Sequence, residues 1–231
     1  MSGRTVLVTR PQPAAGRTAR ALAALGHRAI VAPLFTIMPL PWRMPPGSFD
    51  AVVLTSANAT AASPDALAAA ARLKCFAVGA QTAAAARAAG FRAVTPLGGR
   101  AEAMFAEIAA MPGGPRHLLY LAGRRRTNAP VPEPLSVTVV ETYDAPPLPL
   151  DPAAAAAIAQ GGASALLYSE RAAIELVGEV ERLGLDRAAL TIAALSLKVA
   201  RAAGHGWAAV GTAAEPTEAA LFAAAGLASS R

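Results

Sequence analysis

The chain has 231 residues, enough for two small α/β domains, and 54% of them are hydrophobic, although many of these are alanines that bury little area. The longest apolar stretch, residues 30–42, is interrupted by prolines and is too short to span a bilayer, so we expect no membrane partner. The net charge of +6 favours an anionic partner, but nucleic acid is not expected, since only 5% of the residues are aromatic and no base-stacking surface is evident.

The first predicted elements are a strand over residues 5–8 and an alanine-rich helix that follows Pro11 and Pro13. A strand so close to the start leaves no room for a signal peptide, and we therefore expect none. The single cysteine, Cys75, cannot form an internal disulfide, which favours a reducing, cytoplasmic environment.

A sequence pattern that starts at the end of this helix recurs later in the chain. Residues 23–33, 87–96 and, more loosely, 201–210 each read as a helix end, a glycine and a short strand. Gly26, Gly90 and Gly204 suit the stop, because glycine enters the left-handed backbone region without a Cβ clash.

A second recurring pattern is a buried strand that ends in hydroxyl residues, and it occurs at residues 51–56 and 165–169. Thr82 lies 26 positions after Ser56, and Ser196 lies 27 positions after Ser169; each is expected at the start of an alanine-rich helix. Further strands are expected at residues 75–78, 118–121 and 191–194. This alternation predicts an α/β fold with two doubly wound domains, each a parallel sheet with helices on both faces.

Two extended, proline-bounded stretches interrupt the pattern, and we interpret them as a two-strand linker between the domains. They cover residues 34–41 and 137–147. The first domain is then discontinuous, formed by residues 1–33 and 148–231, and the second is an inserted domain over residues 42–136.

The sequence shows no metal site and no cofactor motif. No G-x-G-x-x-G phosphate loop follows a strand, and the three histidines have no ligand spacing. Cys75 begins a strand, which favours a buried structural thiol over a reactive one.

The remaining candidates are hydroxyl groups at strand ends and helix starts, where doubly wound sheets collect ligands and free N–H groups attract anions. Each of these residues could equally be a helix N-cap, or could both cap and bind. The set comprises Thr9, Thr55, Ser56, Thr82, Ser169 and Ser196. Arg10 and Arg124 follow strand ends and could add positive charge or be solvated, and Tyr143 lies on a connecting strand.

Taken together and in order, these segments resemble the uroporphyrinogen-III synthase family over the whole chain. The resemblance is carried by residues 6–11, 49–59, 76–83, 167–169 and 215–218 and by the strand of Tyr143. The sequence differs from the family in its last third, where residues 193–196 replace a Gly-Pro-Thr-Thr-like turn. The family architecture is two α/β domains joined by a two-strand ladder.

The resemblance implies a lyase of tetrapyrrole and haem biosynthesis. Its substrate would be hydroxymethylbilane, a linear tetrapyrrole with eight carboxylates, which is closed to uroporphyrinogen III with loss of water and inversion of ring D. It implies that Tyr143 donates the proton to the leaving hydroxyl, without metal or cofactor. Substrate carboxylates would be held by Thr9, Arg10, Thr55, Ser56, Asn58, Thr82, Arg124, Ser169 and Ser196. We expect a monomer.

An alternative interpretation is a non-catalytic two-domain protein that binds a small anionic ligand in a cleft. The identity of the isomer formed from hydroxymethylbilane would separate the two, because without an enzyme the chain closes uninverted.

Overall fold

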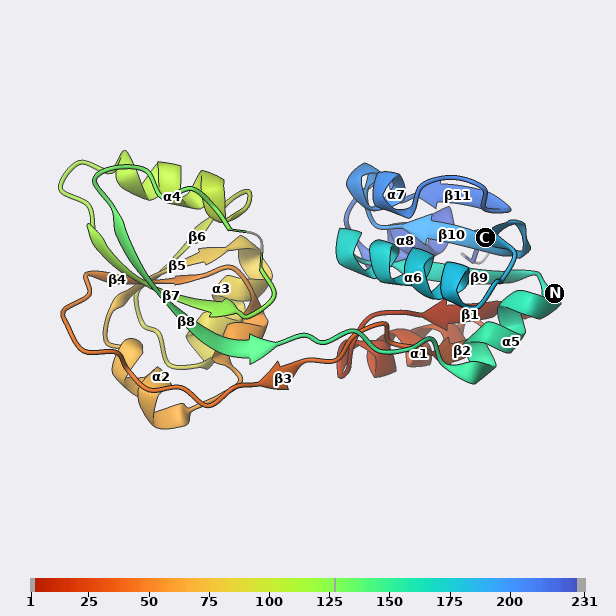
Figure 1. The fold of residues 1–231 in the computed structure, drawn as a ribbon, viewed down its shortest axis with the longest axis horizontal. Coiled ribbons are helices and arrows are strands. Elements are labelled where there is room, and N and C mark those ends of the chain that lie inside the picture. Colours follow the sequence, from red (N-terminus) through yellow and green to blue (C-terminus); the bar gives the residue numbers. More distant parts are fainter. Residues whose placement is uncertain (1–2, 127, 228–231) are drawn as a thin grey trace. The chain divides into compact units, whose positions relative to one another are not determined.

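The computed structural model describes residues 3–126 and 128–227. The chain forms two compact units, one made of Met1–Thr36 and Pro147–Arg231 and the other of Ile37–Pro146 (Figure 1). The domain limits expected from the sequence, 1–33 with 148–231 and 42–136, stay a prediction.

The first unit is built around a five-stranded sheet with the order β11-β10-β9-β1-β2, in which every neighbouring pair is parallel. The chain moves outward from β1 to β2, then returns to the other side of β1 at β9, so the order reverses between β1 and β9. The strands are β1 (Thr5–Val8), β2 (Arg28–Val31), β9 (Ala163–Leu167), β10 (Leu190–Ala194) and β11 (Ala209–Thr212).

Helices cover both faces of this sheet because its strands bury side chains on both sides. One core holds Leu7, Ile192 and the inner faces of three helices, and the other holds Val6, Leu166 and the inner faces of two. The first three helices are α5 (Pro152–Gln160), α6 (Glu170–Arg182) and α7 (Leu197–Ala203); the other two are α1 (Ala14–Ala24) and α8 (Glu218–Ala224). A short 3-10 helix, η2 (Arg187–Ala189), precedes β10.

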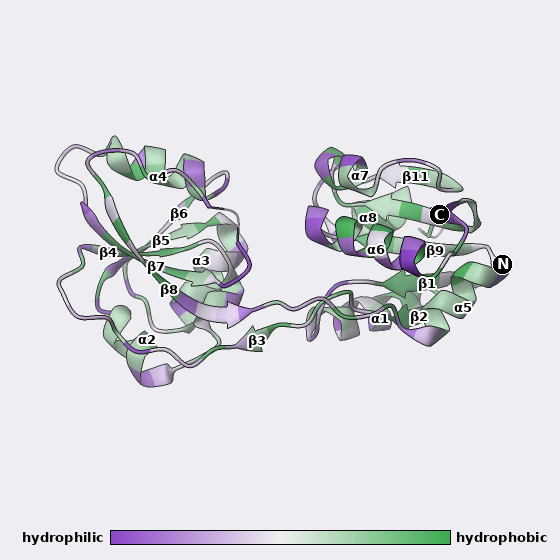
Figure 2. Cartoon of the chain, in the orientation of Figure 1, coloured by the Kyte–Doolittle hydropathy of each residue, from purple (hydrophilic) through white to green (hydrophobic). Residues whose placement is uncertain are grey.

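Figure 2 shows this division in hydropathy, with hydrophobic residues along β1 and β10 and hydrophilic ones among the turns of α6. Helix α6 buries Ala172, Ala173, Leu176 and Val180, which recur with helical spacing and form one stripe. Burial of such a stripe, more than helix propensity, holds a helix of this length on a sheet.

The second unit has a six-stranded sheet with the order β3-β8-β7-β4-β5-β6, parallel except for the β3–β8 pair. Here the order reverses between β4 and β7. The strands are β3 (Met38–Pro39), β4 (Ala51–Leu54), β5 (Lys74–Val78), β6 (Val94–Leu97), β7 (His117–Gly123) and β8 (Ser136–Asp144). The connecting helices are η1 (Ala57–Thr60), α2 (Pro64–Ala70), α3 (Gly79–Ala88) and α4 (Ala101–Ala109).

Both faces of the second sheet are also covered. Leu54, Leu119 and Leu121 face α2 and α3, whereas Phe76 and Leu118 face α4. The predicted α/β class, with parallel sheets and alternating helices and strands, is confirmed. Within the described ranges, no helix combines the length and apolar character needed to cross a membrane.

The two segments expected to link the domains are only partly regular. In the first unit, Phe35 forms an isolated antiparallel bridge with Pro147, and in the second unit the short β3 pairs with Tyr143 and Asp144. Residues 136–144 form β8, which runs parallel to β7 along its length and so belongs to the second sheet.

Candidate functional site

The residues singled out from the sequence lie at or near the carboxyl edges of the two sheets, most of them where a strand ends or a helix begins. Ligands of doubly wound sheets bind at this edge, next to the point where the strand order reverses. At the first sheet lie Thr9, Arg10, Ser169 and Ser196; at the second lie Thr55, Ser56, Asn58, Thr82, Arg124 and Tyr143.

Tyr143 is placed by an irregularity in the ladder between β7 and β8. Ala122 pairs with Glu141 but Gly123 pairs with Tyr143, so Thr142 is the extra residue of a β-bulge. The ring of Tyr143 lies over Gly123, since a Cβ built there would be 2.7 Å from Cζ and 2.9 Å from the hydroxyl oxygen. The ring is partly buried against the core of Leu121, and the bulge and glycine together direct the phenol to the sheet edge.

Arg124 follows Gly123, and its side chain is largely exposed. Its backbone N–H donates to the carbonyl of Tyr143 at 2.8 Å, and its Nε donates to Oε2 of Glu141 at 2.9 Å. This hydrogen bond, reinforced by Arg126, lowers the pKa of Glu141 below its usual value. Arg125 is paired with Asp144 in the same way, at 3.1 Å. The arginine run is thus held at the site by carboxylates of β8.

The hydroxyl residues after β4 have protein partners. Thr55 shares a hydrogen bond of 2.9 Å with the phenol of Tyr120, and Ser56 is the N-cap of η1, accepting from the N–H of Asn58 at 3.2 Å. The cap satisfies a backbone N–H that η1 would otherwise leave unpaired. These contacts order the loop at the strand end, next to the reversal point of the sheet.

Thr82 lies inside α3 and is not its N-cap, because the helix starts at Gly79, directly after β5. Thr82 is 6% exposed and is one of the buried residues of the helix, with Ala83 and Ala86. The structure therefore brings Thr82 close to the carboxyl edge but leaves little of its surface open to a ligand.

Three hydroxyl residues of the first sheet also have structural partners. Thr9 is fully buried, and its hydroxyl donates to the carbonyl of Leu166 at 2.6 Å, which joins β1 to β9. Ser169 and Ser196 are the N-caps of α6 and α7 and accept backbone hydrogen bonds at 3.1 and 3.4 Å. Both serines remain partly exposed at the helix starts.

Arg10 lies after β1 with its guanidinium stacked on the ring of Tyr168, 4.2 Å from Cζ to the ring centroid. Its Nη1 is 3.5 Å from Oε1 of Glu218, and a quarter of its side chain is exposed. Arg10 is therefore held at the carboxyl edge of the first sheet by residues far from it in sequence.

Sequence reasoning missed several residues that the fold gathers at these edges. Tyr120, Arg126, Thr18, Tyr168 and Glu218 are among them. The repeat did contain Tyr168, directly before Ser169, but only as a strand residue. Burial raises the pKa of Tyr120 and raises that of Tyr168 to about 12, so the two phenols lose their protons less readily than an exposed tyrosine.

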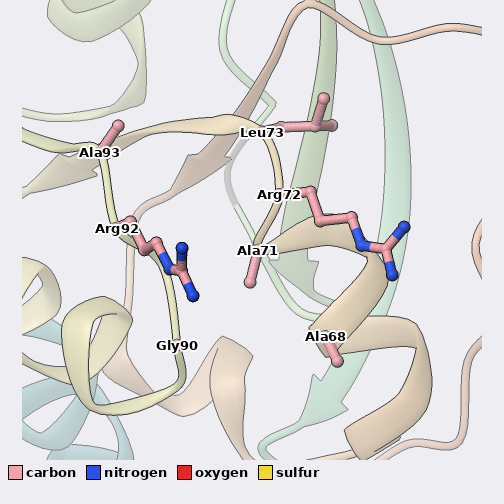
Figure 3. Close-up of a pocket in the computed structure, with 7 residues that line it drawn as sticks. All are labelled: Ala68, Ala71, Arg72, Leu73, Gly90, Arg92 and Ala93. Carbon is pink, nitrogen blue, oxygen red and sulfur yellow. The ribbon is translucent and has the colours of Figure 1, made fainter.

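Three hollows of about 500 Å³ lie elsewhere on the second unit. The first is lined by residues just before β5 and β6, such as Leu73 and Ala93, and thus lies at the amino edge of the sheet. Figure 3 shows the residues that line it, among them three alanines and the side chains of Arg72 and Arg92. None of the three is lined by the predicted residues, and we do not place the site there.

Within residues 3–126 and 128–227, no three side chains of His, Cys, Asp or Glu come together as a metal site would require. The expected independence from metals and cofactors stays a prediction. Burial raises the pKa of the Cys75 thiol to about 12, so it is protonated and a poor nucleophile.

Comparisons with known proteins agree with the fold. The sequence model of one family, uroporphyrinogen-III synthase HemD, matches residues 16–223. Among solved structures, the uroporphyrinogen-III synthetase of Helicobacter pylori is similar with a TM-score of 0.62 at 14% identity, over 96% of this chain and 98% of that one. A mutant uroporphyrinogen III synthase of Thermus thermophilus has a TM-score of 0.55 at 15% identity, over 97% of both chains.

No curated protein sequence matches the chain significantly. The structural likeness, at so low an identity, shows the fold alone. The family model, however, covers most of the chain, including the second sheet, all strands of the first sheet except β1, and every candidate site residue except Thr9 and Arg10. The chain belongs to the uroporphyrinogen-III synthase family.

Proposed function

We propose that Tyr143 is the proton donor of the synthase reaction and that hydroxymethylbilane loses its hydroxyl at the carboxyl edge of the second sheet. The activity of the family is the closure of hydroxymethylbilane to uroporphyrinogen III, with loss of water and inversion of ring D, and the chain is accordingly a lyase. Family membership favours this activity over the alternative of a non-catalytic anion-binding protein.

The chemistry needs little from the protein beyond one proton and a folded substrate. The pyrrole nitrogen of the ring that carries the hydroxymethyl group supplies electrons, the C–O bond breaks, and the oxygen leaves as water after it takes a proton. The resulting azafulvene is attacked by the substituted carbon of ring D, and the spiro intermediate fragments and recloses. A phenol held at the leaving oxygen supplies the proton as a general acid.

The observation that carries the assignment is the position of the Tyr143 ring over Gly123. The bulge at Thr142 and the missing side chain of Gly123 hold the phenol at the edge where ligands of such sheets bind. Tyr120, the other tyrosine of this unit, is buried and already bonded to Thr55, which leaves Tyr143 as the phenol better placed to reach a substrate.

The substrate-binding part of the proposal rests on the partly exposed groups at the sheet edges. Ser56, Ser169 and Ser196 lie at helix starts, where N–H groups and hydroxyls together suit a carboxylate. Arg10 and Arg124 add charge, and Thr55 and Asn58 flank Ser56. Thr9 and Thr82 contribute through the fold, since both are buried.

The test is Tyr143→Phe, assayed by steady-state turnover of hydroxymethylbilane and by the isomer of the product. We expect kcat to fall by about 10- to 100-fold, at or below the lower end of the roughly 10²–10⁴-fold range for general acid catalysis, because the substrate's own nitrogens drive departure of the hydroxyl. The product that still forms on the enzyme should remain isomer III, since folding of the substrate is unchanged.

Tyr120→Phe is the matched control, because it removes a phenol from the same sheet edge. We expect it to lower stability by about 1 kcal/mol through loss of the bond to Thr55, with kcat within about 2-fold of the parent. Circular dichroism checks the fold of both variants. If Tyr143→Phe keeps full kcat, the proton comes from water or from the substrate, and the assignment is wrong.

Two further expectations belong with this function. We propose a cytoplasmic monomer, and the lone, buried free thiol of Cys75 supports the cytoplasmic location. Sedimentation at micromolar concentrations checks the monomer. The anionic tetrapyrrole also accounts for the net charge of +6 without nucleic acid.

A further inference from the structure

Four side chains from four separate elements meet at the carboxyl edge of the first sheet, where its strand order reverses. Arg10 follows β1, Thr18 lies on α1, Tyr168 follows β9 and Glu218 is the first residue of α8. The segments are distant in sequence, with 208 positions between Arg10 and Glu218. The stability of a parallel sheet does not require such a cluster.

The contacts converge on one carboxylate oxygen. Tyr168 donates its phenol to Oε1 of Glu218 at 2.9 Å, and the hydroxyl of the fully buried Thr18 donates to the same oxygen. A tyrosine phenol is protonated at neutral pH, and burial raises the pKa of this one further, to about 12, so Tyr168 is the donor to the carboxylate. The carboxylate and the ring of Tyr168 are therefore fixed relative to each other.

Arg10 rests on this fixed pair. Its guanidinium lies 4.2 Å from the ring centroid of Tyr168, which sets its position, while the ion pair with Glu218 at 3.5 Å is long for an arginine–carboxylate contact. A guanidinium has five N–H donors, and among the described residues only Nη1 has a hydrogen-bond partner, Glu218. The remaining donors suit a second carboxylate, bound in the bidentate manner that arginine favours.

We propose that Tyr168 and Glu218 are positioning residues that hold Arg10 ready to bind a carboxylate of hydroxymethylbilane. Tyr168 fixes the place of the guanidinium without neutralising it. Glu218 orients Tyr168 through the phenol, and it also competes with the substrate for Arg10. The proposal rests on the synthase activity for the identity of the ligand and is independent of the role of Tyr143.

The two residues therefore have opposite expected effects on binding. Tyr168→Leu removes the ring that places Arg10 and should raise the KM for hydroxymethylbilane by about 3- to 10-fold. Tyr168→Phe keeps the ring and loses only its bond to Glu218, and it should raise KM less, by about 2-fold. Glu218→Gln keeps an acceptor oxygen for Thr18 and Tyr168 but removes the competing charge. It should lower KM by about 2- to 3-fold at low salt, with the gain lost at high salt.

Arg10→Ala provides the background that isolates the mechanism. It should raise KM at least as much as Tyr168→Leu does. In double variants that carry Arg10→Ala, adding Tyr168→Leu should not raise KM further, and adding Glu218→Gln should not lower it. In every variant kcat should stay within about 2-fold of the parent, because Arg10 takes no part in the proton transfer. Equilibrium titration with uroporphyrin III, which keeps eight carboxylates and requires no turnover, should give the same order of affinities.

The outcomes are separable. If the cluster only stabilises the fold, Tyr168→Leu will lower the unfolding midpoint, and Glu218→Gln will leave KM and the affinity for uroporphyrin III unchanged. This result overturns the proposal. If Tyr168→Leu fails to fold, the KM of Glu218→Gln measured at low and at high salt still tests the proposal. Failure of the Tyr143 assignment appears only as an unchanged kcat in Tyr143→Phe, with these affinities unaffected.

Discussion

At the residue scale, Gly123 determines where the phenol of Tyr143 can lie. Gly123→Ala would put a methyl group 2.7 Å from Cζ of Tyr143, well inside contact distance, so the ring must move. We expect kcat to fall by about 10-fold or more, approaching the loss in Tyr143→Phe, because a proton donor displaced by an ångström loses its alignment. The measurement is steady-state kinetics with circular dichroism as the folding check.

Gly98→Ala is the matched control, because nothing lies within 4 Å of a Cβ built at Gly98. Its kcat should equal that of the parent. Unchanged kcat in Gly123→Ala, with Tyr143→Phe impaired, would show that the phenol does not depend on this seat.

The contacts of single residues also show why a hydroxyl side chain at a strand end does not by itself indicate a binding site. Thr9 turns into the sheet and bonds a neighbouring strand, whereas Ser169 turns outward and caps a helix. The first is buried and the second is partly exposed, and only the second combines a cap with access to a ligand.

At the element scale, the start of α6 tests whether a cap also binds substrate. Ser169→Ala should destabilise the chain by about 1 kcal/mol through loss of the cap bond to Ala172, and it should also raise KM. Asp186→Ala is the control, since Asp186 caps η2 with a bond of 2.8 Å to Ala188 before β10, at the opposite edge of the sheet. Urea unfolding and kinetics on both variants check this. Equal stability losses with unchanged KM in both would leave Ser169 as a cap alone.

Helix α6 is also fastened to the segment before α5, through Glu179. The carboxylate accepts from Nε and Nη2 of Arg182 and, at 2.6 Å, from the backbone N–H of Leu150, and these bonds lower its pKa below the usual value. A lowered pKa in the folded state stabilises the protein above the unfolded pKa, and this stability is lost as pH falls through the folded value.

Glu179→Gln should therefore lower the free energy of unfolding by about 1 kcal/mol at pH 7, with the difference shrinking as the pH is brought below about 4. Urea titrations at the two pH values measure it. Glu175→Gln, which removes an i,i+4 surface pair with Arg171, serves as control and should cost about 0.3–0.5 kcal/mol at most. A difference that persists at low pH would mean that the charge of Glu179 is not responsible.

At the scale of the whole molecule, each unit has its own cores and its own tryptophan. Trp42 is buried in the second unit and Trp207 in the first, where its Nε1 donates to the carbonyl of Ala203 at 2.9 Å. Variants that keep one tryptophan, made with Trp42→Phe or Trp207→Phe, should report the unfolding of each unit separately.

Phe105→Ala removes a fully packed ring from α4 and should destabilise the second unit by about 3–5 kcal/mol. The urea midpoint reported by Trp42 should fall, and the midpoint reported by Trp207 should not. Ile158→Ala, in the core beneath α5, should do the reverse. If both tryptophans report the same shift in each variant, the two units unfold as one cooperative body.

The sequence by itself determined the elements and the fold class. Buried strands, alanine-rich helices and glycine stops are local features, and Gly26, Gly90 and Gly204 indeed take positive φ values of 79°, 97° and 72°. Alternation of such elements leads to parallel sheets, because parallel strands need a crossover helix between them. The resemblance over the whole chain then led to the family.

Tertiary structure alone decided which side chains meet. The strand order brings β9 beside β1, which places Tyr168 against Arg10, and the packing of α8 on the same sheet adds Glu218. The irregular pairing of β7 with β8 places Tyr143 over Gly123. Helix and strand propensities act over a few neighbouring residues, whereas these contacts join residues up to 208 positions apart. Their geometry depends on how whole helices and strands pack, and a local sequence pattern does not predict that packing.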